Sequence, residues 1–148
     1  MFQRIINTNN DFTVAILRLL VGAVFFAHGA QKMLGWFGGF GFTGTMGFFT
    51  HMGIPAPFAF LAIAAEFFGG LGLIVGFLAR IGAFGIIGNM VVAVMMVHRQ
   101  NGLFMNWSGN QKGEGFEFHI LAVALLWLIV VKGSGALSVD RFLSEKRP

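Results

Sequence analysis

The chain has 148 residues, of which 56% are hydrophobic and only 11% are charged. A soluble domain of this length needs far more charged residues on its surface, so the composition indicates an integral membrane protein that faces lipid. Cysteine is absent, which excludes a disulfide framework, a CxxC redox pair and thiolate metal sites. The net charge of +4 comes from basic residues beside hydrophobic runs, a pattern typical of membrane topology and not of nucleic-acid binding.

The first hydrophobic run predicts a helix over residues 12–34. It is roughly 23 residues long, or about 34 Å as a helix, which is enough to cross the bilayer core. Asn9, Asn10 and Asp11 precede it, and these residue types commonly cap the start of a helix. The sequence therefore predicts a membrane span that begins close to Phe12.

Three further hydrophobic runs predict helices over residues 57–79, 81–99 and 116–132. The second helix follows the rigid Pro-containing turn 53–57, and the fourth ends at the glycine-rich segment 132–135. With no linker in the sequence, residues 1–148 are predicted to form a single transmembrane domain. The predicted fold class is all-α, an integral membrane four-helix antiparallel bundle.

Lysine and arginine residues in the loops predict the orientation of the helices. Six lie on the side of the two termini: Arg4, Arg80, Lys132, Arg141, Lys146 and Arg147. Three lie on the other side: Lys32, Arg99 and Lys112. The positive-inside rule therefore predicts a multi-pass protein of the cytoplasmic (inner) membrane with both termini in the cytoplasm. The long loops 35–57 and 99–115, rich in glycine and aromatic residues, are expected to face outward and to lie in the interface or over the helices.

Ionisable side chains inside the predicted spans are the most informative feature, because each costs roughly 2.5–3.5 kcal/mol to insert without a partner or a wet cavity. Placing the helices antiparallel brings most of these side chains into one layer between the membrane centre and the outer surface. That layer contains His28, Lys32, Glu66, His98, Glu117 and His119, with Arg18 able to reach towards it from below. We regard all seven as candidates for ligand binding or proton transfer.

Arg18 and Glu66 allow two interpretations. They can form a structural ion pair that joins the first and second helices, or they can act directly on a ligand or a proton. The glycines of the second and third helices, such as Gly69 and Gly82, are predicted to allow close helix packing, and Asn89 to bond across the bundle.

The histidines allow three interpretations. They can exchange protons or hydrogen bonds with a quinone, close the loops as interfacial hydrogen-bonding groups, or bind a metal. Neither the HxxxH nor the ExxH spacing that a helical metal site favours is present. We therefore predict no metal site, and the sequence leaves the catalytic residues unassigned.

The chain resembles the DoxX family of small four-helix bacterial membrane proteins. The resemblance extends from about Thr13 to Val131 and rests on the order and spacing of short segments. These are Leu17-Arg18-Leu19, His28-Gly29 with Lys32, Gly53-Ile54-Pro55, Glu66-Phe67-Phe68-Gly69-Gly70 with Gly76, His98 with Asn101-Gly102, and Glu117. The resemblance implies a subunit of an oxidoreductase system with links to quinone, catechol or thiol stress, although fold kinship alone does not fix function.

Our leading hypothesis is a membrane subunit that binds a quinone, or a similar lipophilic redox molecule, non-covalently in an outward-facing polar cavity. A soluble redox partner would supply the electrons. The alternative is a non-catalytic scaffold or small transporter, in which the buried ion pair is structural. The glycine-rich helix faces are compatible with a homodimer as well as with a monomer.

Overall fold

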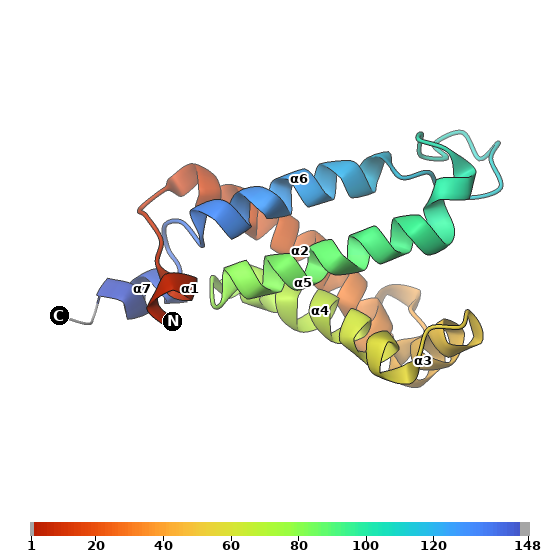
Figure 1. Ribbon diagram of the computed structural model, residues 1–148, viewed down its shortest axis with the longest axis horizontal. Coiled ribbons are helices and arrows are strands. Elements are labelled where there is room, and N and C mark those ends of the chain that lie inside the picture. The colour runs from red at the N-terminus through yellow and green to blue at the C-terminus, as the bar shows by residue number, and fades with distance from the viewer. Residues whose placement is uncertain (1, 146–148) are drawn as a thin grey trace.

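The computed structural model describes residues 2–145, which form helices joined by turns and one longer loop (Figure 1). The α-helices are α1 (Phe2–Ile6), α2 (Phe12–Leu34), α3 (Gly41–His51), α4 (Ala56–Val75), α5 (Ala79–Ala93), α6 (Glu117–Lys132) and α7 (Val139–Glu145). A π-turn (Val94–His98) and a 3-10 turn (Arg99–Asn101) continue α5, and a second 3-10 turn covers Trp36–Gly38. No strand occurs among the described residues, so they form an all-α fold as predicted.

Three helical segments are long and apolar enough to cross a membrane. They are Phe12–Leu34, Ala56–Val75 and Ala79–Asn101, the last of which joins α5 to the two turns that follow it. The fourth predicted span corresponds to α6, which has 16 residues and is shorter than these three. The protein is therefore a membrane protein, while the fourth span stays a prediction.

The ends of α2 follow from its flanking residues. The carboxylate of Asp11 accepts hydrogen bonds from the backbone N–H groups of Thr13 (2.9 Å) and Val14 (3.1 Å), as the predicted capping role requires. At the other end Gly35 adopts a left-handed conformation with φ of 74°, which terminates the helix without strain on a side chain. The observed bounds of α2 are those predicted.

A tight turn between α4 and α5 shifts the predicted boundary at residues 79–81. Gly76 and Leu78 both have positive φ, so α4 ends at Val75 and α5 already begins at Ala79. A positive φ is energetically costly at leucine, so this turn needs stabilising contacts from another part of the chain. The carboxylate of Asp140 in α7 accepts hydrogen bonds from the N–H groups of Leu78 (2.8 Å) and Ala79 (3.1 Å) and from the Ser134 hydroxyl.

Asp140 thus caps α5 from the far end of the chain, and its removal is expected to destabilise this turn. Asp140 is fully buried, so Asp140→Ala would leave three donors without their acceptor, at a cost of about 2 kcal/mol or more. Thermal unfolding in detergent should show this loss. Asp11→Ala, which removes a half-buried cap, should cost only about 1 kcal/mol. Equal effects of the two substitutions would contradict the role given to Asp140.

The segment 35–57 is not the extended loop that its glycines suggested. Residues Gly41–His51 form α3, a helix that packs against α2 and α4 and buries only Thr45. Three glycines at three-residue intervals (Gly41, Gly44 and Gly47) concealed the helix in the sequence, because glycine is a poor helix former. This helix covers one end of the molecule, in keeping with the expectation that the loop folds over the helices.

Consecutive long helices pack side by side, α2 on α4, α4 on α5 and α5 on α6 (Figure 1). Their shared core is apolar and consists of Val21, Phe25, Leu73, Ala79, Ala83, Ile86, Met90, Ala122, Leu126 and Ile129. The short helices α1 and α7 pack together near both chain ends, which lie at the same end of the molecule (Figure 1). We call this the terminal end and the opposite one, with α3 and the loop 102–116, the loop end.

Candidate functional site

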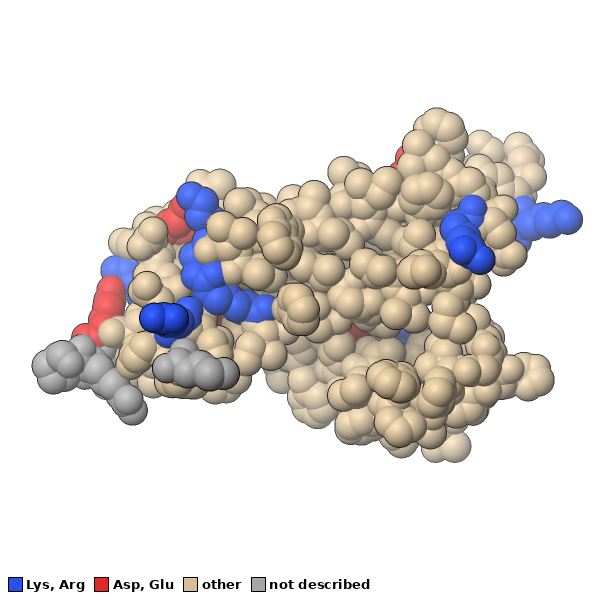
Figure 2. All heavy atoms as spheres, in the orientation of Figure 1, with Lys and Arg blue, Asp and Glu red and all other residues tan. Residues whose placement is uncertain are grey.

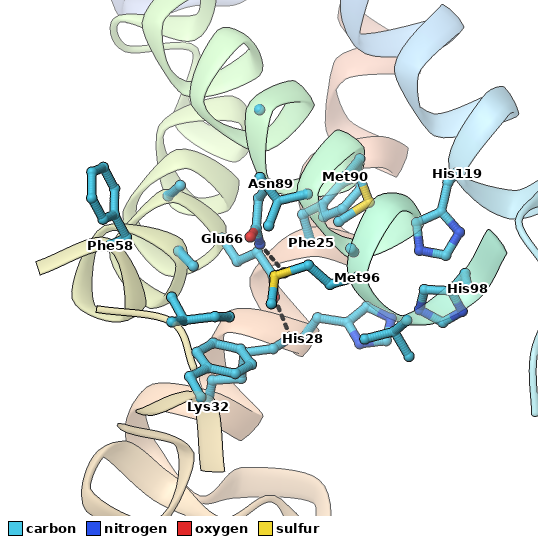
Figure 3. Close-up of a pocket in the computed structure, with 18 of the residues that line it drawn as sticks. Phe25, His28, Lys32, Phe58, Glu66, Asn89, Met90, Met96, His98 and His119 are labelled. Carbon is cyan, nitrogen blue, oxygen red and sulfur yellow. Dashed lines mark hydrogen bonds and ion pairs between the residues drawn. The ribbon is translucent and has the colours of Figure 1, made fainter. Parts of the chain in front are cut away.

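A cavity of about 820 Å³ lies near the loop end, between α2, α3, α4, α5 and α6 (Figure 3). Most of its lining is apolar, with side chains such as Phe25, Met90 and Phe118. Its polar lining residues are His28, Lys32, Glu66, Asn89, His98, Glu114 and His119. Five of the seven predicted site residues therefore line a single cavity.

Glu66 anchors one wall of this cavity. Its side chain is almost completely buried, and its two oxygens have different partners. The Lys32 ammonium forms an ion pair with Oε2, and the Asn89 amide donates a hydrogen bond of 2.6 Å to Oε1 (Figure 3). These contacts join α2, α4 and α5 through one carboxylate. The bond that Asn89 was predicted to make across the bundle is confirmed.

The predicted ion pair between Arg18 and Glu66 is wrong, because the ion-pair partner of Glu66 is Lys32. Arg18 lies 14 positions before Lys32 on the same helix, a separation of about 21 Å along the axis. Since α2 and α4 run in opposite directions, Arg18 meets the end of α4, whereas Glu66 lies closer to its middle.

Arg18 is buried at the terminal end and does not line the cavity. Its guanidinium donates to backbone carbonyl oxygens of the last turn of α4 and of the segment after α6. The acceptors are Leu73, Ile74 (2.7 Å), Ser134 (2.8 Å), Leu137 (3.2 Å) and Ala136 (3.5 Å). Carbonyl groups at a helix end lack intrahelical partners and carry partial negative charge, so a cation is well placed there. Arg18 has a structural role at this end.

Three histidines line the cavity: His28 of α2, His98 of the π-turn and His119 of α6. The His98 and His119 rings lie 4.2 Å apart between centroids (Figure 3). His98 Nδ1 lies 2.8 Å from the carbonyl oxygen of Glu114, which can only accept, so Nδ1 carries the proton and Nε2 is left as an acceptor. The π-turn Val94–His98 is consistent with a functional position, because such turns are frequent at functional sites.

His119 has a ring nitrogen without a partner in the cavity wall. It is 6% exposed, and its Nδ1 atom is buried without a hydrogen-bond partner among the described residues. A buried polar atom that lacks a hydrogen-bond partner costs about 1–3 kcal/mol of stability. The unpaired nitrogen of His119 therefore points to a ligand atom as its partner. Within residues 2–145, no three histidine or carboxylate side chains are grouped so as to hold a metal ion.

Glu117 lies outside this cavity, although the sequence grouped it with the site. Its carboxylate accepts hydrogen bonds from the backbone of Met105 (2.9 Å) and from the Trp107 indole (3.3 Å), and it thereby holds the loop 102–116. Glu114 lines the cavity instead, and sequence reasoning missed it because it lies outside the predicted spans. Only the fold of the loop brings Glu114 back towards His98.

Comparisons with known proteins give one family and two relatives. The family model described as DoxX matches residues 13–99. "Inner membrane protein YqjF" of Escherichia coli (strain K12) is 28% identical over 136 residues, which cover 92% of this chain and 95% of that protein. "Putative oxidoreductase CatD" of Bacillus subtilis (strain 168) is 27% identical over 137 residues, which cover 93% of this chain and 91% of that protein. No solved structure matches the chain.

Proposed function

The chain belongs to the DoxX family, and from this premise we propose that it is the membrane subunit of an oxidoreductase system. In this proposal the cavity binds a quinone, or a similar lipophilic redox molecule, and a soluble redox partner supplies the electrons. The name of the Bacillus subtilis relative supports an oxidoreductase, and the name of the Escherichia coli relative supports an inner-membrane location.

The observation that carries the proposal is the chemistry of the cavity lining. Small-molecule sites are typically concave and mostly apolar, with a few polar groups that fix the orientation of the ligand. This cavity fits that description, and close to the ring of His98 it offers Nδ1 of His119, which has no hydrogen-bond partner within residues 2–145. A flat ring with carbonyl or hydroxyl oxygens would match both the apolar lining and these polar atoms.

A bound quinone would accept two electrons and two protons when it is reduced to the quinol. The histidines of this chain are suited to pass those protons, because a neutral imidazole carries one nitrogen that donates a proton and one that accepts it. Lys32 balances the charge of Glu66, which keeps that wall electrically neutral while protons move on the other side. The backbone carbonyl of Glu114 would keep His98 in the tautomer whose Nε2 can accept a proton.

We further propose that α2, α4, α5 and α6 form four antiparallel membrane spans, with both termini in the cytoplasm. The common position of the two chain ends and the excess of lysine and arginine on their side support this arrangement. The cavity would then lie towards the outer face of the membrane.

Quinone binding to the purified protein tests the proposal. Wild-type protein in nanodiscs is titrated with decylubiquinone, and saturable binding is expected. His119→Phe keeps an aromatic ring but removes both nitrogens, and it should weaken binding by about tenfold, the effect of roughly one lost hydrogen bond.

The matched control is Ala124→Phe, an exposed position on α6 outside the cavity, which should bind decylubiquinone like the wild type. A complementary assay measures quinone reduction in membranes that contain His28→Ala. The absence of saturable binding, together with unchanged quinone reduction by His28→Ala, would overturn the proposal.

A further inference from the structure

A second hollow adjoins the cavity and is built from α4, α5 and the turn between them. This hollow, which we call the groove, has a volume of about 510 Å³. Leu61, Ala65 and Gly85 line both the cavity and the groove, so the two hollows share part of their walls. From there the groove follows α4 to Val75, a distance of about 21 Å at 1.5 Å per residue.

The groove is apolar along its whole length, and small residues make it hollow. Ala64, Gly69, Gly72 and Gly82 line it beside larger apolar side chains, and no charged residue does. Gly69 and Gly82 bring the backbones of α4 and α5 close together, which leaves a furrow on the outer side of the helix pair. Such a furrow fits a flexible apolar chain better than it fits a polar ligand.

The cavity opens sideways, towards the region that lipid would occupy. Figure 2 views the helices from the side, in the orientation of Figure 1, and shows a hollow between α5 and the part formed by α3 and α4. A basic and an acidic side chain are visible inside it. Large apolar side chains that line the cavity are exposed here, among them Leu61 (57%) on α4 and Val92 (46%) on α5. Both helices belong to segments long enough to cross a membrane.

We infer that the ligand is an amphiphile with a long apolar tail, which reaches the cavity sideways from the bilayer between α4 and α5. Its head group lies against Glu66 and His119, and its tail lies in the groove from Leu61 towards Val75. This inference rests on the proposed function for the redox chemistry of the head group. The groove is the evidence for the apolar tail and for the sideways route, because a water-soluble ligand gains no binding energy from an apolar furrow beside its site.

A tail-length experiment tests the tail. Wild-type protein in nanodiscs is titrated with two quinones that share one head group, decylubiquinone and the tail-less parent, and affinities are referred to the lipid-phase concentration. Close packing of the tail against the groove walls should make decylubiquinone bind about tenfold more tightly, since transfer from lipid to the groove brings van der Waals contacts but no hydrophobic gain. Ala64→Phe fills the groove away from the cavity and should abolish that advantage while leaving the tail-less quinone unaffected. Ala124→Phe on α6 is the matched control and should retain the advantage.

Equal affinity for both quinones, unchanged by Ala64→Phe, would overturn the inference and leave the proposed function standing. If neither quinone binds and quinone reduction by His28→Ala is also unchanged, the proposed function fails instead, and the sideways opening is still decided by a measurement that needs no quinone.

That measurement uses the natural absence of cysteine in the chain. Val92→Cys at the cavity opening and Ser108→Cys in the exposed loop are each labelled with bimane. Lipid-phase nitroxide should quench the label at position 92 more strongly than aqueous iodide does, with the reverse order at position 108. Iodide quenching at position 92 as strong as at position 108 would show that the cavity opens to water, and it would overturn the lateral route.

Discussion

Arg18→Ala is expected to abolish the stable fold of the protein, although Arg18 lies outside the proposed site. Its guanidinium donates hydrogen bonds to five backbone carbonyl groups, which belong to the end of α4 and to the segment after α6. Each buried carbonyl without a donor costs about 1–3 kcal/mol, so the loss should exceed about 3 kcal/mol. That is a large part of the 5–15 kcal/mol by which folded proteins are typically stable. Denaturant unfolding in detergent micelles would measure it.

The shape of the guanidinium matters in this network as much as its charge. Arg18→Lys keeps the charge but offers three donors from one atom, which cannot reach acceptors on two separate segments. This variant should therefore recover only part of the stability. The control is Arg141→Ala, which removes a partly exposed ion pair with Glu145 and should cost less than about 1 kcal/mol. If Arg18→Ala is as stable as Arg141→Ala, the structural role of Arg18 is wrong.

Gly29→Ala is also expected to be strongly destabilising, although it adds a single methyl group. At this position α2 crosses α4 so closely that a Cβ atom would overlap backbone atoms of Phe67 and Glu66. Gly70 is the matching glycine on α4, and a Cβ atom there would overlap the backbone of Phe26 on α2. Since backbone atoms cannot rotate away, the helices must separate, at a cost of about 1–3 kcal/mol or more.

The consequence of Gly29→Ala extends to the candidate site, because Lys32 and Glu66 join the same two helices. Separation of α2 and α4 should weaken that ion pair and reduce quinone binding along with thermal stability. Gly47→Ala in α3 is the control, since a Cβ atom there meets nothing within 4 Å. It should leave stability unchanged or raise it by about 0.5–1 kcal/mol, the usual gain of alanine over glycine in a helix. Opposite signs for the two substitutions would confirm the assignment, and similar effects would contradict it.

The sequence by itself determined that the chain is helical, that it belongs in a membrane, and where α2 begins and ends. These properties depend on composition, on the length of apolar runs and on local caps such as Asp11, all of which act between near neighbours. The sequence also identified His28, Lys32, Glu66, His98 and His119 as unusual, because an ionisable group inside an apolar run is costly wherever it lies.

Only the tertiary structure decided which of these groups meet. Lys32 and not Arg18 pairs with Glu66, since the pairing depends on the relative depth of two antiparallel helices, which one-dimensional spacing does not fix. The remote cap that Asp140 provides for α5 also depends on contacts between segments about 60 positions apart. The same holds for the return of Glu114 to His98, where the loop's own hydrogen bonds set the path. Local physics therefore determined the helices, and the packing of helices against each other determined the cavity and its partners.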